Sequence, residues 1–431
     1  MHARRVLSSL IIAATGFAAA PVAAEPVPSI RLAESNTDES VALEIAAHTM
    51  RKPGVPTAIV LVGVAHIGSG DYYAALQRLL DRQEVVLFEG VKPGWSEEPS
   101  PDASATVRTR ITEARMRHAG AIIERAKLEL RRAPEDVAEA FAATGAGDPI
   151  DRAAFMDAWG NPLEYRRTER EDQRIETDLV SLGADAKPGG RDDDRDIALS
   201  DQPALTRTEI DPPTGIQGDL AAAMGLEFQL EAIDYTGEGW INSDVSAERL
   251  LLDLAGRDDE EVVIGSGVPE APDDPLLAML SGDSPLAKIA GGLLRFAGMT
   301  NFGRSMMKIF LIETLARADE LMPVAAEQMG DSGSDFMRVI LEVRNDVVLE
   351  ALDEQLELRQ PPGSVALFWG AAHLEGIQEA LVADGWEVTD SEWFPAIELD
   401  EQTSGLSPSR IKSLRDTVSQ TLDMQLRMLG G

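Results

Sequence analysis

Two histidines end apolar stretches that share one local pattern. The first stretch has the sequence AIVLVGVAH and ends at His66, and the second has the sequence VALFWGAAH and ends at His373. Both stretches therefore close with Gly-x-x-His. Imidazole transfers protons near neutral pH and is a common metal ligand in proteins. The repeated pattern singles out these two histidines, because the other three, His2, His48 and His118, lack it.

A carboxylate and a guanidinium complete the set of candidate groups. Glu89 directly follows the apolar residues Val85 to Phe88, and a carboxylate is costly to bury unless it is paired or bound to a metal. Arg344 lies in a predicted helix, and its neighbours three and four positions away are all apolar. A guanidinium turned into the core needs an anion. It could pair with a structural carboxylate, hold Glu89, or stabilise negative charge on a substrate.

These residue types support two kinds of chemistry. His66, His373 and Glu89 form a ligand set for a divalent metal ion (Mn, Co, Fe or Zn) that keeps a position open for water. The ion would activate that water, with Glu89 and Arg344 as the catalytic residues. In the metal-free alternative, His66 acts as a general base that His373 and Glu89 orient.

The elements that carry these residues predict where they meet. Continuous apolar runs bounded by glycine are typical of strands buried on both faces of a parallel sheet. Ligands bind at the carboxyl edge of such a sheet, so we expect His66, Glu89 and His373 to lie there. The predicted strand, helix and strand elements are 57–67, 71–81, 84–91, 365–373, 375–383 and 386–389. We predict an α/β fold with a central, mostly parallel sheet, built from N- and C-terminal βαβ units with large helical insertions.

The chain divides into three predicted parts. Residues 1–24 have the pattern of a signal peptide, residues 25–400 form one α/β domain, and residues 401–431 form a C-terminal helix. Within the domain, residues 91–214 are predicted to be a helical, partly disordered acidic insertion. Residues 276–334 are predicted to be a helical lid or lining.

Several local predictions depend on shorter patterns. We expect helices at Ser40 to Thr49 and at Asp335 to Leu358, a strand at Glu227 to Tyr235, and a terminal helix at Ser409 to Met428. Asp244 precedes a predicted helix, so we expect it to cap that helix, with a role in the site as the alternative.

Composition limits the classes of partner. The chain has 74 acidic against 39 basic residues and a formal net charge of −35, which disfavours nucleic acid and anionic membrane surfaces. It has no cysteine, so a thiol nucleophile is excluded. Arg4 and Arg5, the apolar stretch after them and a small-residue site ending at Ala24 predict a periplasmic or secreted protein. The expected partner is a peptide or small-molecule substrate.

Four sequence segments together resemble one known family. Gly63-Val-Ala-His66, Phe88-Glu89, Arg344-Asn345 and Gly370-Ala-Ala-His373-Leu-Glu-Gly look like the TraB/GumN (Tiki-like) family of the erythromycin-esterase/ChaN-like superfamily. The resemblance covers residues 57–91 and 335–389. It implies an α/β fold and, for the Tiki branch, a metal-dependent protease. It also implies that His66 and His373 are metal ligands and that Glu89 is a ligand or general base.

We therefore expect a secreted metal-dependent hydrolase, most simply a Tiki-like peptidase that uses metal-activated water. The alternative is a non-catalytic periplasmic binder of a peptide signal or a haem-like ligand, as the ChaN-like resemblance implies. The apolar stretch Leu286 to Met299 would form its pocket.

Overall fold

The protein is described here from a computed structural model. The structure describes residues 26–34, 40–210, 216–254, 300–328 and 331–429. The predicted signal peptide and the apolar stretch at 286–299 lie outside these residues, as do residues 276–299 and 329–330 of the predicted lid.

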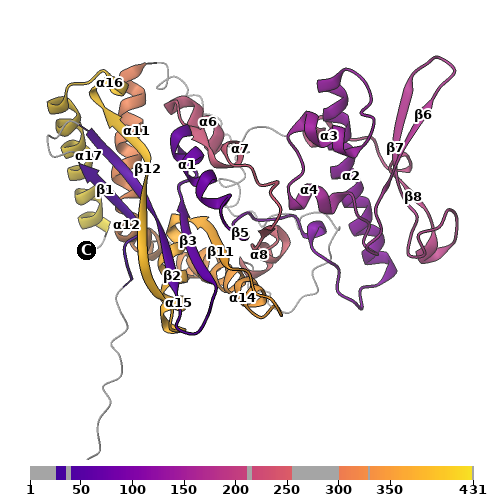
Figure 1. Ribbon diagram of the computed structural model, residues 1–431. Helices are drawn as coiled ribbons and strands as arrows, with labels where there is room; N and C mark the ends of the chain where they lie inside the picture. The colour runs from indigo at the N-terminus through magenta and orange to yellow at the C-terminus, as the bar shows by residue number, and fades with distance from the viewer. Residues whose placement is uncertain (1–25, 35–39, 211–215, 255–299, 329–330, 430–431) are drawn as a thin grey trace, which may run out of the picture.

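A seven-stranded mixed sheet forms the centre of the molecule (Figure 1). Its strand order is β1-β2-β3-β11-β5-β10, and β12 pairs with β2. The strands β3, β11, β5 and β10 are parallel, whereas β1, β2 and β12 pair antiparallel. This arrangement confirms the predicted α/β fold. The bounds are β1 (Ile30–Glu34), β2 (Ser40–Arg51), β3 (Ala58–Val64), β5 (Val85–Phe88), β10 (Trp240–Asn242), β11 (Ser364–Gly370) and β12 (Glu387–Asp400).

The C-terminal strand β11 lies between the two N-terminal strands β3 and β5. Trp369 is in register with Gly63 of β3, and Phe368 is in register with Phe88 of β5. All of β3 and nearly all of β11 is buried, as the continuous apolar sequences predict. This insertion brings the end of β11 between the ends of β3 and β5, although the two parts of the chain are far apart in sequence.

Helices cover both faces of the sheet (Figure 1). One core contains residues of α1 (Gly70–Leu80), α6 (Ile216–Met224), α11 (Asn301–Leu315) and α17 (Pro408–Leu429). The other core contains residues of α14 (Arg344–Leu356) and α15 (Leu374–Ala383). The predicted terminal helix is confirmed as α17. Its buried residues Ile411, Val418 and Leu422 recur at helical spacing.

A separate lobe, residues 92–210, lies beside the sheet (Figure 1). It has its own core, which includes Met116, Ile122, Phe155, Leu179 and Ile197. Its helices are α2 (Ala105–Leu130), α3 (Val137–Thr144), α4 (Pro149–Ala154) and α5 (Arg207–Ile210), and its antiparallel sheet is β6 (Glu164–Glu169), β7 (Ile175–Ser181) and β8 (Ile197–Ala198). Short 3₁₀ turns occupy η1 (Gly94–Ser96), η2 (Asp192–Asp194) and η3 (Leu199–Asp201).

Three local predictions differ from the structure. The predicted helix at 40–49 is strand β2, because β12 pairs along its length and β1 and β3 also pair with it, which buries nearly every residue. The predicted strand at 227–235 ends after two residues. The predicted helix at 335–358 contains a π-helix, η4 (Arg338–Val343), between α13 (Asp331–Met337) and α14.

The remaining elements are short or peripheral. They are β4 (Ile67–Gly68), β9 (Glu227–Phe228), α7 (Gln229–Ala232), α8 (Ala247–Leu254), α12 (Ala318–Gln328), η5 (Ala371–His373) and α16 (Glu401–Ser404). Among the described residues, no helix is long and apolar enough to cross a membrane.

Candidate functional site

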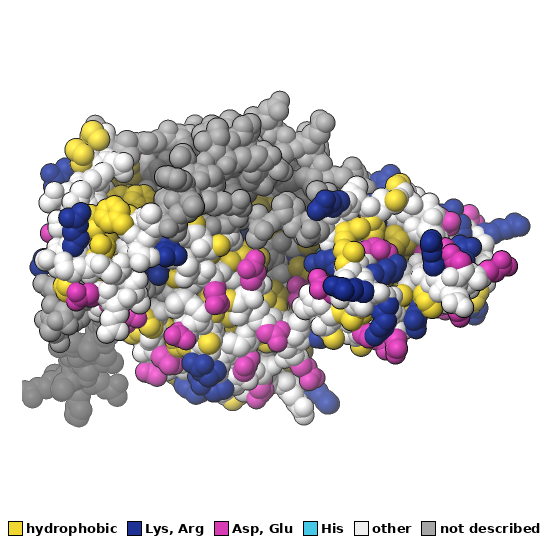
Figure 2. Space-filling model, turned by 90° about the horizontal axis from the view of Figure 1, so that it is seen from above, with side chains coloured by type: hydrophobic (Ala, Val, Ile, Leu, Met, Phe, Trp, Pro, Cys, Tyr) yellow, Lys and Arg dark blue, Asp and Glu magenta, His cyan; other side chains and the backbone are white. Residues whose placement is uncertain are grey.

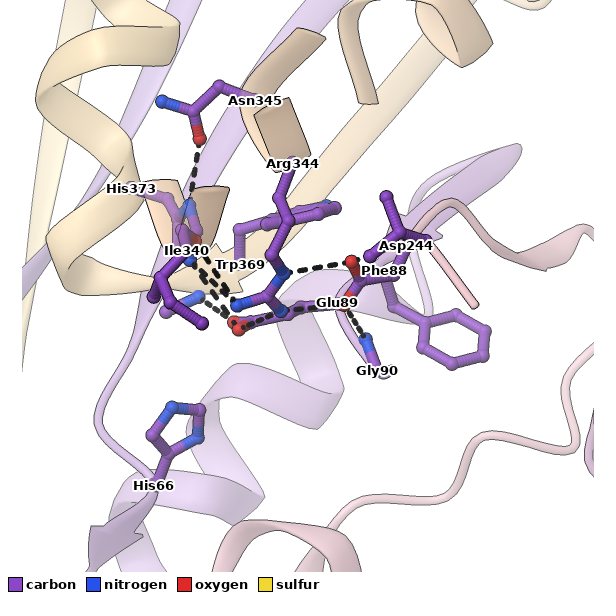
Figure 3. Close-up of polar contacts among 12 residues, drawn as sticks. His66, Phe88, Glu89, Gly90, Asp244, Ile340, Arg344, Asn345, Trp369 and His373 are labelled. Atoms are coloured by element: carbon purple, nitrogen blue, oxygen red, sulfur yellow. Dashed lines mark hydrogen bonds and ion pairs between the residues drawn. The ribbon is translucent and has the colours of Figure 1, made fainter. Parts of the chain in front are cut away.

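The four residues singled out from the sequence lie at one edge of the sheet (Figure 3). Glu89 directly follows β5, His66 follows β3 by two positions, and His373 lies in the turn η5 after β11. Arg344 is the first residue of α14, which covers the adjacent face. Glu89, Arg344 and His373 are buried, whereas the side of the site that carries His66 is exposed.

Arg344 is held between two carboxylates. Its Nε donates to Oδ1 of Asp244 at 2.9 Å and its Nη2 to Oδ2 at 2.6 Å. The same Nη2 donates to Oε1 of Glu89 at 2.7 Å. Burial alone would lower the pKa of Arg344, but the hydrogen bonds and charges of Asp244 and Glu89 raise it above its usual value. The guanidinium is therefore a fixed positive charge.

The π-helix η4 directly precedes Arg344. Consecutive residues of a regular α-helix are about 100° apart around its axis, yet Arg344 and the next residue, Asn345, both reach the site. The Nη1 atom of Arg344 contacts the carbonyl of Ile340 within η4 at 3.5 Å. Single π turns occur often at functional sites. This one directly precedes the two residues of α14 that reach the site.

His373 is a neutral, oriented imidazole. Its Nδ1 lies 2.8 Å from Oδ1 of Asn345; because that oxygen can only accept, Nδ1 carries the proton. Its Nε2 lies 3.4 Å from Nη1 of Arg344 and 3.6 Å from Oε1 of Glu89. Burial lowers the pKa of His373 to about 4, and although Glu89 opposes this shift, Arg344 adds to it. His373 is thus uncharged at neutral pH.

Glu89 is ionised despite its burial. Burial would raise its pKa, but the positive charge of Arg344 and the backbone N–H of Gly370 hold the pKa below its usual value. The Gly370 N–H donates to Oε2 at 2.5 Å. Both carboxylate oxygens therefore have donors from the protein itself.

Asp244 belongs to the site and does not cap α8. Its Oδ2 accepts from the backbone N–H of Gly90 as well as from Arg344, and the residue is fully buried. The helix begins at Ala247, so the capping position falls on Ser246, whose hydroxyl accepts from the N–H of Arg249. The prediction of an Asp244 cap is wrong because the helix starts two residues later than a cap at Asp244 requires.

His66 lies beside this network. Its ring lies apart from the other residues in Figure 3, and no dashed line joins them. A Cβ built on Gly370 would lie 3.5 Å from Nε2 of His66 and 2.8 Å from Oε2 of Glu89. The other ring nitrogen, Nδ1, lies 2.8 Å from Oε1 of Gln229. The exposed imidazole thus turns Nε2 toward the position next to Gly370.

The residues do not fit the predicted divalent metal ion in this arrangement. Both oxygens of Glu89 are occupied by Arg344 and Gly370. The Nε2 atom of His373 faces the guanidinium of Arg344, and a second cation there would be repelled. Within the part of the chain that the structure describes, no group of three or more His, Cys, Asp or Glu side chains is placed to hold a metal ion.

Two residues of the site, Gln229 and Asn345, are not predicted to be functional from the sequence, because their segments have weak local patterns. For Asp244 the sequence favours a helix cap, and its place in the site is the alternative interpretation. The one available signal was that Asp244 follows the apolar pair Trp240-Ile241. These residues form strand β10, which pairs parallel with β5 and so ends at the same edge.

Comparison with known proteins gives one partial similarity. The model of the family "Type II secretion system (T2SS), protein G" matches residues 127–200. The matched segment covers the end of α2, α3, α4 and the β6-β7-β8 sheet, so it lies in the lobe and contains no residue of the site. No curated protein and no solved structure matches the chain.

These findings correct the family and the activity expected from the sequence. The matching family model is T2SS protein G, not TraB/GumN or ChaN, so the predicted family is wrong. The predictions of a metal-dependent peptidase and of a ChaN-like binder depended on that resemblance, so they are wrong as well. Four short segments of common residues were too little sequence to identify the family.

Proposed function

We propose that the chain is an enzyme that works by metal-independent acid–base catalysis, with His66 as the general base. The observation that carries this proposal is the orientation of His66: Nδ1 is occupied by Gln229, while Nε2 faces the position beside Gly370 and Glu89. Because His66 is exposed, its Nε2 lone pair can accept a proton from a hydroxyl group that binds on the solvent side of this position.

The buried network supplies the fixed charges around that position. His66 takes the proton of the substrate hydroxyl as its oxygen attacks the carbonyl carbon of an acyl donor, and it returns that proton to the group that leaves the donor. Arg344 holds Glu89 in place, and its Nη1 makes only contacts of 3.4 and 3.5 Å among the described residues. This N–H group is the one available to stabilise negative charge that develops on the substrate.

The charges of the site residues indicate which class of substrate can bind there. Glu89 and Asp244 contribute two negative charges and Arg344 one positive charge, while His373 is neutral. The centre is therefore net negative, as is the whole chain at −35. An anionic substrate would be repelled, so we propose a neutral or cationic compound that carries a hydroxyl group.

A substrate screen tests the proposal. The purified protein is incubated with EDTA and a panel of hydroxyl-bearing compounds, each paired with an activated, uncharged acyl donor, and turnover is followed by mass spectrometry. We expect turnover by the wild type, a loss of about 100-fold or more in His66→Gln, and full activity in His118→Gln, which changes a histidine of the lobe. Turnover that is equal in His66→Gln, or that needs an added metal ion, contradicts the proposal.

We also propose that the enzyme works outside the cytoplasm. The N-terminal sequence with Arg4 and Arg5, an apolar stretch and a small-residue site at Ala24 supports export. N-terminal sequencing of the protein recovered from the periplasm tests this, with Glu25 as the expected first residue. Recovery of the full-length chain from the cytoplasm alone would contradict export.

A second candidate function concerns the lobe. The match to T2SS protein G covers residues 127–200 of this lobe, and Figure 2 shows lysine and arginine side chains on the lobe, interspersed with aspartate and glutamate. Its β6–β7 hairpin exposes Arg166, Arg167, Arg170 and Arg174. We propose that the hairpin attaches the enzyme to a secretion assembly. Purified T2SS components should bind the wild type and not a variant with these four arginines changed to glutamate; equal or absent binding contradicts this role.

A further inference from the structure

Gln229 binds His66 at two points. Its backbone N–H donates to the His66 carbonyl at 2.9 Å, and its side-chain Oε1 lies 2.8 Å from Nδ1 of His66. The backbone bond extends the pairing of β4 with β9, which joins Ile67 to Phe228. Gln229 is almost fully buried, whereas the His66 ring is exposed. The buried Gln229 thus holds the exposed His66 ring in one orientation.

Tyr235 contacts the other end of the Gln229 amide. The amide Nε2 donates to the Tyr235 hydroxyl at 2.9 Å, and the carbonyl oxygen faces Nδ1 of His66. Burial raises the pKa of Tyr235 above its usual value, so the hydroxyl stays neutral and can accept this bond.

Tyr235 is itself held by aromatic rings from three strands of the sheet. Its ring centroid lies 5.0 Å from Phe88 of β5, 5.5 Å from Trp240 of β10 and 6.4 Å from Phe368 of β11. These strands also lead into Glu89, Asp244 and Gly370. The orientation of His66 is therefore tied to the strands that carry the buried network.

We propose that Gln229 is a positioning residue that holds His66 in one tautomer, with the proton on Nδ1 and the lone pair on Nε2. An amide oxygen can only accept, so the Nδ1–H form keeps the hydrogen bond and the Nε2–H form loses it. A buried acceptor without its donor is costly, and this cost selects the tautomer. The inference rests on the proposed function, because only the Nδ1–H form presents a basic Nε2 to the substrate position.

Nitrogen NMR measures the tautomer directly, with no need for a substrate. The chain is labelled with 15N-histidine, the His66 signals are assigned by comparison with His66→Gln, and spectra are recorded at a pH where the imidazole is neutral. We expect the Nδ1–H form to predominate in the wild type and in Gln229→Glu, which keeps an acceptor. In Gln229→Met it should fall toward the mixture of a free imidazole. In Tyr235→Phe, which frees the amide to rotate, it should fall part of the way.

A matched control separates a local effect from general disturbance of the fold. Gln378 is also fully buried but bonds to the backbone of Val27, so Gln378→Met should leave the His66 tautomer unchanged. A predominant Nε2–H form in the wild type overturns the proposal, as does the same tautomer ratio in Gln229→Met and Tyr235→Phe as in the wild type. If the tautomer behaves as expected but His66→Gln keeps full turnover, the positioning role stands and the general-base function fails.

Discussion

Asp244 and Arg344 lie 100 residues apart in the chain and form a two-point ion pair in the core, with Oδ1 to Nε at 2.9 Å and Oδ2 to Nη2 at 2.6 Å. Two parallel hydrogen bonds fix the plane of the guanidinium as well as its position. The remaining N–H groups are then directed at Glu89 and His373. Asp244 therefore sets the geometry of the whole network.

Removal of Asp244 should be strongly destabilising. In Asp244→Ala the buried guanidinium loses one of its two carboxylates, and breaking a buried pair by removing one partner costs about 3–5 kcal/mol. Urea unfolding measures the loss of free energy. Glu176→Ala is the control, because its ion pair with Arg170 is exposed and should contribute under about 1 kcal/mol. Equal losses in the two variants would show that the buried Asp244 pair contributes no more to the free energy of unfolding than an exposed pair.

His373 should make stability depend on pH. Burial lowers its pKa from 6.5 to about 4, so the unfolded chain binds this proton at a higher pH than the folded chain. The contribution is fully present above pH 6.5 and is lost as the pH falls toward 4. Between pH 7 and pH 5 the loss is about 2 kcal/mol.

Unfolding free energies of the wild type and His373→Gln at pH 7 and pH 5 test this dependence. The variant lacks the titrating group, so its stability should change less between the two pH values, by about 2 kcal/mol. The same change in both proteins would mean that His373 is not buried in its neutral form.

A methyl group on Gly370 should disturb the site. In Gly370→Ala the new Cβ would lie 2.8 Å from Oε2 of Glu89, too close for an unstrained contact, so Glu89 must move and overpacking should cost about 1–3 kcal/mol. Gly363→Ala is the control at the other end of β11. In Gly363→Ala the new Cβ would also lie close to a carboxylate, at 2.9 Å from Glu84. Glu84 is exposed and can move aside. Calorimetry should show a clear drop in Tm for Gly370→Ala only; matching Tm values would contradict the tight contact.

The sequence predicts the edge of the sheet at which the site lies, but it does not predict the strand order or every residue of the site. Strand ends of a parallel sheet meet at one edge, and this rule placed Glu89 and His373 together. The position of β11 between β3 and β5 depends on contacts between distant segments that no local pattern contains. Strand β2 was mistaken for a helix because its residues are apolar at most positions, which removes the alternation that marks a strand with one wet face.

Asn345 and Gln229 were not predicted, and Asp244 was predicted only as an alternative, for a different reason. Each is a common polar residue in an unremarkable local sequence, and only the folded chain brings it to Arg344, His373 or His66. The π-helix that precedes Arg344 and Asn345 is also not predicted by any local sequence pattern.

Metal content tests the one cofactor expected from the sequence. A divalent ion on His66, Glu89 and His373 remains a prediction of the sequence, but the network fills the oxygens of Glu89 with protein donors. We therefore expect equal, negligible metal by mass spectrometry in the wild type and in His66→Ala. Stoichiometric metal in the wild type that is lost in His66→Ala would contradict this expectation.

The central claim is that His66 acts as a base on a substrate bound against the Glu89–Arg344 network. The most direct test is the rate constant kcat/KM of the wild type and of His66→Gln, measured in EDTA on the same hydroxyl-bearing substrate. The account predicts a rate for the variant lower by about 100-fold or more, with the wild type unaffected by EDTA. Equal rates for the two proteins would contradict it.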